Sequence, residues 1–192
     1  MNQFTGNFED RLGALERQVA HARDLSEINE VLVRYSRALD WLDDALLDSV
    51  ILDDAEIDYG FFKGSGKDFK PVLMAIERGV GRRWHFTSQV EIALYGDRAE
   101  VESYNLTLGA ASISPSPPDE VTQFYGKYID VMLRRDGRWG IIQRRHLLLS
   151  AFAVRELPLE GNFAQFNRIG EALTTHPDYR AFAIGPNQTG AI

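Results

Sequence analysis

Apolar residues recur at helical spacing through the first part of the chain. The first such pattern predicts a short amphipathic helix over residues 9–22, with Leu12 and Val19 on its apolar side. This helix could dock on its own domain or on a second subunit. Asp24 precedes Glu27 in an arrangement that resembles a capping box, so we expect a second helix to begin there.

The second predicted helix carries a continuous apolar stripe. Its core-facing positions follow the spacing i, i+4, i+7, i+11 and i+14: Ile28, Leu32, Tyr35, Leu39 and Leu42. Asp40 lies roughly 100° around the helix from the centre of this stripe, at the edge of the buried face. Asp43 lies nearer the stripe, and either carboxylate could simply belong to an acidic helix end.

Three further elements are expected before the pattern changes. They are a short helix over residues 44–50, a strand over residues 55–62 and a helix over residues 68–78. Pro71 falls in the first turn of the last helix, where proline is tolerated. The Gly-rich run at residues 64–68 is too short for a phosphate-binding loop, and it predicts only a turn.

From Arg83 onward, polar and apolar residues alternate with period two, which predicts β-strands. Two hairpins are expected, the first with its return strand over residues 99–110 and the second joining residues 121–134 to residues 138–149. A Pro/Ser-rich loop separates them. Residues 161–173 could add a last helix.

Helices followed by hairpin-connected strands are the order of an α+β domain. In such a domain the helices lie against one face of a mainly antiparallel sheet. Long curved strands with helices on the concave side can enclose a cone-shaped pocket. We expect any chemistry to take place in that pocket.

The composition excludes several classes of site and partner. The chain has 192 residues, enough for one domain, and its 44% apolar and 26% charged residues are ordinary for a soluble globular protein. The absence of cysteine excludes disulfides, thiolate catalysis and cysteine-ligated zinc. A net charge of −7 disfavours nucleic acid and anionic membranes, and leaves a small molecule or a protein as partner. The N-terminus has no apolar signal segment, so we expect a cytoplasmic location.

Three segments of the chain resemble the NTF2-like superfamily, in its SnoaL-like and scytalone dehydratase-like branch: residues 35–59, 84–88 and 134–141. The resemblance implies a curved, cone-shaped sheet, antiparallel or mixed, with the N-terminal helices on its concave face around a pocket. It implies an N-terminal helical extension over residues 1–25, the NTF2-like domain over residues 26–150 and a C-terminal extension over residues 151–192. Such sheets commonly pair through their convex faces, which implies a homo-oligomer, either a dimer or a trimer.

The resemblance also implies a catalytic pair. In dehydratase and dehydrochlorinase members, an Asp at the end of the long helix and a His at the start of a strand form a general-base dyad. Asp40 and His85 match those positions, and Tyr59 matches a tyrosine that scytalone dehydratase uses to bind its substrate. The chain lacks that enzyme's second active-site histidine, and it has Gly126 and Tyr128 where the enzyme has serine and asparagine. Scytalone is therefore not the expected substrate.

An imidazole oriented by a carboxylate is a base suited to elimination. With a pKa near 6.5, His85 could take a proton at neutral pH while Asp40 fixed its tautomer. Substrate contacts are expected from four aromatic residues: Trp84, Tyr59, Tyr125 and Tyr128. Developing negative charge could be stabilised from the last strand by one of three residues: Arg144, Arg145 or His146. The many aromatic residues favour an aromatic substrate, although protein cores use them too.

Other interpretations of these residues stay open. His85, between Trp84 and Phe86, could be structural, because strand alternation places it on a face that suits solvent as well as a pocket. The four histidines have no spacing typical of metal ligands, and proton transfer needs no metal or other cofactor. We expect a cofactor-independent lyase of aromatic catabolism, acting by dehydration or by C–C cleavage that releases formaldehyde. The alternatives are a ligand-binding module, the small subunit of an aromatic-ring dioxygenase, and a polyketide cyclase or isomerase.

Overall fold

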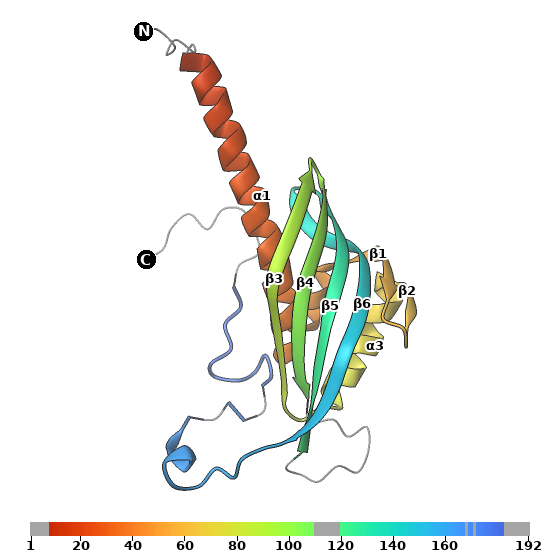
Figure 1. Ribbon diagram of the computed structural model, residues 1–192, viewed down its shortest axis with the longest axis vertical. Helices are drawn as coiled ribbons and strands as arrows, with labels where there is room; N and C mark the ends of the chain where they lie inside the picture. The colour runs from red at the N-terminus through yellow and green to blue at the C-terminus, as the bar shows by residue number, and fades with distance from the viewer. Residues whose placement is uncertain (1–7, 110–119, 168, 171, 183–192) are drawn as a thin grey trace.

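The computed structural model of the chain describes residues 8–109, 120–167, 169–170 and 172–182 (Figure 1). Its elements in chain order are α1 (Phe8–Asp40), α2 (Asp44–Asp48), β1 (Ile51–Asp58), β2 (Lys63–Ser65), α3 (Gly66–Arg78), β3 (Arg83–Tyr95), β4 (Arg98–Gly109), β5 (Glu120–Arg135), β6 (Arg138–Arg155) and the short 3-10 helix η1 (Gly161–Gln165). The predicted Pro/Ser-rich loop falls almost wholly outside the described residues.

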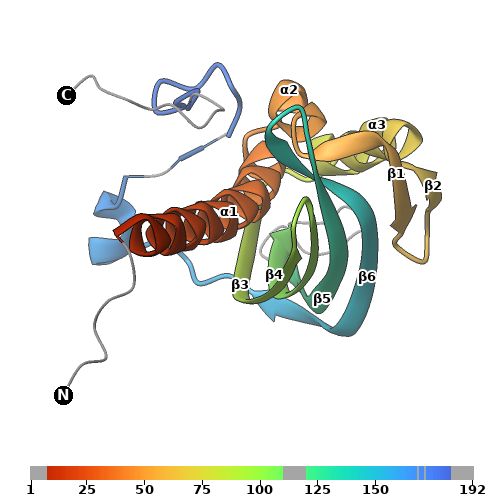
Figure 2. The ribbon, with the colours of Figure 1, turned by 90° about the horizontal axis from the view of Figure 1, so that it is seen from above.

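The strands form one curved, mixed sheet in the order β2-β1-β6-β5-β4-β3. Neighbouring strands are antiparallel except β1 and β6, which are parallel. The sheet curves around the C-terminal half of α1, and α2 and α3 lie near the same side (Figure 2). The α+β class and the cone-shaped sheet with helices on its concave face are therefore confirmed.

The predicted boundary between two N-terminal helices is wrong. α1 runs without a break for 33 residues, and Asp24 lies inside it. The Asp24 carboxylate accepts hydrogen bonds from Arg134, at 2.5 Å, and from the Trp139 indole, at 3.4 Å. It therefore binds side chains of the second hairpin and does not cap a helix. The N-terminal part of α1 projects away from the sheet (Figure 1), and Leu12 and Val19 there are exposed.

The predicted stripe of the second helix faces the core. Ile28, Leu32, Tyr35 and Leu39 are all buried in the main hydrophobic cluster. This burial supplies most of the stability of the C-terminal half of α1, since isolated helices are marginal in water. It also fixes the rotation of the helix, which places Asp40 at the sheet.

A β-bulge in β3 decides which of its side chains face inward. The register against β4 shifts between Ser88 and Glu91, and Gln89 adopts a positive φ of 50°. Before the bulge, His85 is buried while the alternating apolar side chains point outward; after it, apolar residues pack on the core. One extra residue thus reverses the alternation and gives the inner face a polar and an apolar section.

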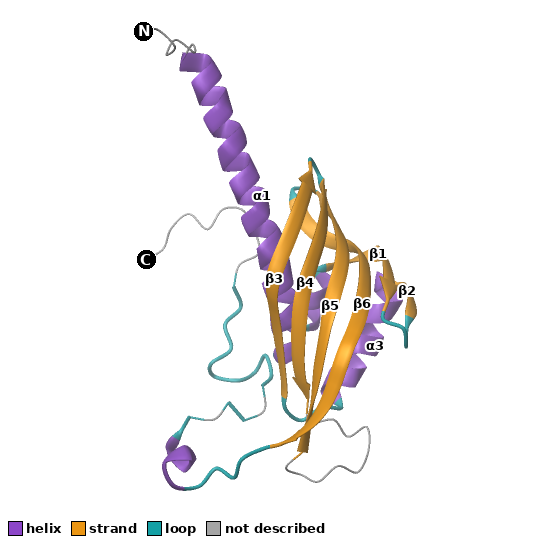
Figure 3. Cartoon of the chain, viewed as in Figure 1, coloured by secondary structure: helices purple, strands orange, loops and turns teal. Residues whose placement is uncertain are grey.

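The last predicted helix is only partly present. Residues 161–173 contain the short η1, and the other described residues of the tail form no helix or strand (Figure 3). Phe163, Phe166 and Ile169 are more than half exposed, so no core contact stabilises a longer helix. Among the described helices, none is long and apolar enough to cross a membrane.

Candidate active site

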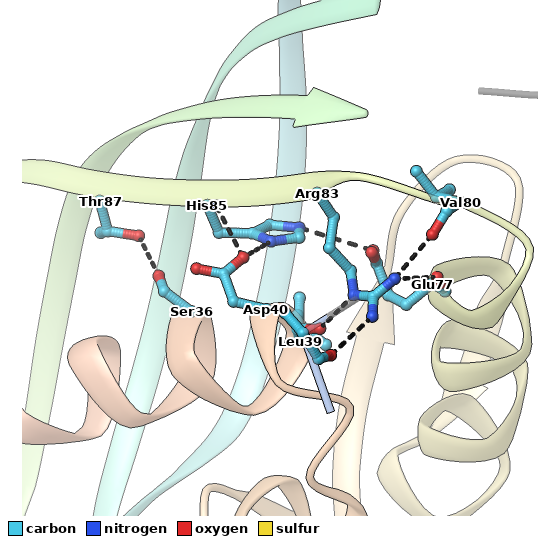
Figure 4. Close-up of polar contacts among 9 residues, drawn as sticks. Ser36, Leu39, Asp40, Glu77, Val80, Arg83, His85 and Thr87 are labelled. Carbon is cyan, nitrogen blue, oxygen red and sulfur yellow. Dashed lines mark hydrogen bonds and ion pairs between the residues drawn. The ribbon is translucent and has the colours of Figure 1, made fainter. Parts of the chain in front are cut away.

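Asp40 and His85 meet where α1 ends and β3 begins. His85 Nδ1 lies 2.8 Å from Asp40 Oδ1, and the main-chain N–H of His85 donates to the same oxygen at 2.9 Å (Figure 4). Their side chains are 6% and 21% exposed. With Nδ1–H donating to Asp40, the neutral imidazole presents its free electron pair at Nε2.

A second carboxylate, which sequence reasoning missed, faces the other side of the ring. Glu77 Oε1 in the last turn of α3 lies 3.5 Å from His85 Nε2, and the Glu77 side chain is only 10% exposed. A sequence signal existed, because Glu77 stands four residues after Leu73 on the buried face of an amphipathic helix. A carboxylate at such a position needs a buried partner.

The two carboxylates hold a proton on the imidazole. Burial lowers the pKa of His85, but the contacts with Asp40 and Glu77 outweigh it and raise the pKa to about 9. Burial also raises the pKa of Asp40; the His85 contact opposes this shift and Glu77 adds to it. The three groups together therefore keep a proton that separate side chains would release, and His85 is largely an imidazolium at neutral pH.

Arg83 fixes the helix ends that carry the two carboxylates. Its guanidinium donates to the carbonyl of Leu39, at 3.1 Å, and to the carbonyls of Glu77 and Val80, at 3.1 and 2.6 Å (Figure 4). Leu39 and Glu77 lie in the last turns of α1 and α3, where main-chain acceptors lack helical partners, and Val80 follows the end of α3. Arg83 is thus a positioning residue for Asp40 and Glu77.

Three of the predicted substrate-binding residues line the inner face deeper in the sheet. The hydroxyls of Tyr59 and Tyr35 are 2.6 Å apart, and the rings of Tyr59 and His146 stack at a centroid distance of 5.0 Å. Tyr128 is buried beside both. Burial and the nearby charge of Arg144 lower the pKa of His146 to about 4, so it is neutral at physiological pH.

The structure places three other residues predicted to bind substrate on the face of the sheet opposite the dyad. Tyr125, Arg145 and Trp84 lie on the outer face of the sheet, because strand neighbours alternate between faces. Tyr125 instead donates to Gln123 at 2.9 Å, and Trp84 is 48% exposed. On β6 it is Arg144, the residue before Arg145, that points inward.

A sequence profile described as a SnoaL-like domain matches residues 20–145, a span that includes Asp40, Glu77 and His85. The chain belongs to the SnoaL-like family. Among curated protein sequences, no relative matches it.

Solved structures similar to this SnoaL-like chain share its fold at low identity. A candidate scytalone dehydratase from Novosphingobium aromaticivorans is 19% identical, covers 83% of this chain and 98% of its own, and has a TM-score of 0.63. A hexachlorocyclohexane dehydrochlorinase from Novosphingobium barchaimii is 16% identical, covers 73% and 99%, and has a TM-score of 0.64. A candidate aromatic ring hydroxylase from N. aromaticivorans is 18% identical, covers 69% and 94%, and has a TM-score of 0.60.

In this SnoaL-like chain the His85 side chain is shielded from solvent and the Asp40 side chain is partly exposed. Two hollows of about 650 and 730 Å³ lie elsewhere, one between α1 and the tail near Tyr179 and one between α2 and α3 near Lys70. Neither is lined by Asp40 or His85. Glu77 Oε1 faces His85 Nε2 at 3.5 Å, so a ligand that exchanges a proton at Nε2 must displace Glu77. Among the described residues, no group of three or more candidate ligands is arranged to hold a metal ion.

Proposed function

We propose that the protein is a cofactor-independent lyase in which His85 moves a proton under the control of Asp40 and Glu77. The observation that carries the proposal is a buried imidazole held at 2.8 Å by one carboxylate and at 3.5 Å by another. Buried titratable clusters with strongly shifted pKa values are typical of sites that transfer protons. The scytalone dehydratase and dehydrochlorinase folds noted above support an elimination.

Each of the two proposed eliminations needs only the substrate and the His85 imidazole, and no other reagent. In a dehydration, Nε2 of neutral His85 takes a proton from carbon, and the C–H electron pair forms the new double bond. The C–O bond breaks with its electrons on oxygen, and the imidazolium returns the proton so that water leaves. In the formaldehyde-releasing variant, Nε2 takes the hydroxyl proton of a hydroxymethyl group, the C–C bond breaks, and the carbanion is protonated by the imidazolium.

The raised pKa of His85 sets a condition on this mechanism. With a pKa of about 9, on the order of 1% of the imidazole is neutral at pH 7. A His85 base therefore predicts that kcat/KM rises with pH until about 9, since that parameter follows the free enzyme. A rate that falls above that pH would instead make His85 the proton donor.

The proposal is tested by incubating the purified protein with oxygenated aromatic alcohols and diols and weighing the products by mass spectrometry. A lyase gives a product lighter by water or formaldehyde, whereas a cyclase or isomerase conserves mass. His85→Ala and Asp40→Asn should abolish turnover, and the exposed control His21→Gln should not. Full activity in folded His85→Ala would remove His85 from the mechanism.

We also propose that the protein is a homo-oligomer formed through the outer face of the sheet. Trp84, Phe86 and Phe152 are about half exposed there, and exposed aromatic patches are typical of interfaces. Sedimentation velocity measures the mass directly. Trp84→Glu together with Phe86→Lys should give monomers, and a monomeric wild type would contradict the proposal.

A further inference from the structure

The N-terminal half of α1 carries an apolar stripe that the described part of the domain leaves uncovered. Its four large members are between 44% and 76% exposed, and the smaller Ala22 is exposed too; the four are Phe8, Leu12, Leu15 and Val19. This part of the helix projects away from the sheet (Figure 1), and none of these residues belongs to the hydrophobic core. The sequence allowed the segment to dock on its own domain or on a second subunit, and the structure does not place it on its own domain.

The stripe faces away from the domain to which α1 belongs. At 100° per residue, its centre lies roughly 180° around the helix from the core stripe of Ile28, Leu32, Tyr35 and Leu39. Because α1 runs without a break, its first half cannot turn this face toward its own sheet. An isolated helix of this length is marginal in water, so contact with another molecule would stabilise it.

The spacing of the stripe is that of a coiled coil. Its members are four, three, four and three positions apart, which is the heptad repeat that keeps one seam of a helix against a partner helix. Leu15 occupies a d position of this repeat and the β-branched Val19 an a position, a combination that favours two-stranded coils. The next seam positions, Ser26 and Asn29, are polar and end the apolar seam where the core stripe begins.

The charges beside the seam distinguish the two orientations of a helix pair. In a parallel pair, a g position of one helix adjoins the e position of the next heptad of the other, so Arg11 of each copy faces Glu16 of the second copy. Two equivalent ion pairs then flank the seam. In an antiparallel pair, e positions adjoin each other, and Glu16 falls beside Glu9 or Glu16 of the second copy. The charges therefore favour the parallel orientation.

The size of the seam indicates how strong such a pairing can be. Residues 8–22 span about 22 Å at 1.5 Å per residue, and a helix is about 10 Å wide. This strip is smaller than the roughly 800 Å² that each partner buries in a stable interface. The pairing is therefore weak on its own, and it requires a high concentration of protein.

We propose that the first halves of α1 from two copies of this chain form a short, parallel coiled coil over residues 8–22. Each apolar residue of the seam packs on its own equivalent, as a two-fold axis along the coil requires. The two domains lie at the same end of the coil, each on the side of its helix that faces away from the partner helix. This contact is separate from the outer face of the sheet, and it depends neither on that face nor on the lyase activity.

Sedimentation velocity of the full chain tests the pairing in a variant that lacks the other proposed contact between copies. Trp84→Glu with Phe86→Lys, monomeric in dilute solution, should form dimers when its concentration is raised about a hundredfold. Adding Leu15→Glu places a charge in the seam and should abolish these dimers. Adding Ala20→Glu places the same charge outside the seam, so this matched control should still dimerise. The absence of any concentration-dependent association, or dimers that survive Leu15→Glu, would overturn the proposal.

Leu15→Glu should not act by unfolding the domain. Leu15 packs against no residue of the hydrophobic core, so the variant should melt at the same temperature as its parent in dilute solution. A lower melting temperature would give Leu15 a structural role within one copy and contradict an uncovered seam.

Disulfide cross-linking tests the orientation, because the chain has no cysteine of its own. Phe8→Cys and Val19→Cys, made separately in the wild-type chain, each place one thiol in the seam. In the parallel coil each thiol lies opposite its equivalent, so oxidation should join either variant into covalent dimers at least tenfold faster than Arg17→Cys, whose thiol lies on the other side of the helix. Cross-linking only in a mixture of the two seam variants would indicate an antiparallel pair and refute the proposed orientation. Cross-linking no faster than in the control would refute the coil.

Discussion

The inner face of the sheet carries two histidines with different charge states, His85, which is buried, and His146, which is partly buried. His85 lies between two carboxylates, which raise its pKa to about 9, whereas burial beside Arg144 lowers the pKa of His146 to about 4. The residue type is the same and the backbone setting is a β-strand in both cases. The difference shows that neighbouring charges decide whether an imidazole on this face of the sheet keeps a proton or remains neutral.

Replacing each histidine should separate the two roles most strongly. His85→Gln keeps a donor toward Asp40 but cannot accept a proton, so we expect kcat/KM to fall by about 10²- to 10⁴-fold. His146→Phe keeps the stacked ring on Tyr59 and should cost less than tenfold. Steady-state kinetics on both folded variants makes the comparison. Equal losses would show that His85 has no special part in the reaction.

The two histidines also predict opposite slopes of stability against pH. The folded pKa of His85 is raised above its unfolded value of about 6.5, so its stabilisation is complete below pH 6.5 and is lost as pH rises toward 9. The loss is about 3 kcal/mol of unfolding free energy. Urea denaturation across this range measures it. The His85→Gln variant should lose this slope, and a wild type with flat stability would contradict the raised pKa.

Glu77→Gln should bring the two histidines closer in behaviour. Removing one of the two carboxylates that raise the pKa of His85 should bring that pKa down from about 9 toward its ordinary value. The rising limb of kcat/KM should move to lower pH, and more neutral imidazole should be present at pH 7. Proton NMR of the His85 ring reports the same shift. Glu100→Gln, at an exposed carboxylate of the same sheet, serves as control and should leave the titration in place.

The smallest expected effect concerns His146 alone. Its folded pKa is lowered, so its neutral form stabilises the protein above pH 6.5, and this stabilisation is lost as pH falls toward 4. His146→Phe should remove the loss of stability between pH 6.5 and pH 4, and it should leave the stability at pH 8 nearly unchanged. Thermal unfolding at pH 5 and pH 8 measures both. If the variant still loses stability at acid pH, that loss must come from the protonation of carboxylates and not from His146.

Local patterns predicted most of the fold. The buried stripe of α1 and the two hairpins follow from spacing alone, because periodicity reports which face of an element is buried. The helix boundary predicted at Asp24 was wrong. A carboxylate that caps a helix and one that binds residues distant in the chain cannot be told apart in the sequence. The length of α1 therefore depends on contacts with Arg134 and Trp139, more than 100 residues later.

The candidate site was less predictable. The helical periodicity placed Asp40 only at the edge of the buried face. Its pairing with His85 was predicted from the family resemblance, because 45 residues separate the two and no local pattern connects them. The sequence left Arg144 and Arg145 as alternatives, because bulges between β5 and β6 shift the alternation of faces and only the structure shows which of the two points inward. Bulges leave no clear mark in a single sequence, so inward and outward residues cannot be assigned by counting from a turn.

The hydrogen bond from the His85 main chain to Asp40 has a consequence beyond chemistry. β3 is the outermost strand of the sheet, and outermost strands expose amides to which a foreign strand can add. The main-chain amide of His85 is one of these, and it donates to Asp40. The carboxylate that orients the imidazole therefore also keeps this edge amide from pairing with a strand of another molecule. We therefore expect Asp40→Ala to lower solubility as well as the activity proposed for His85.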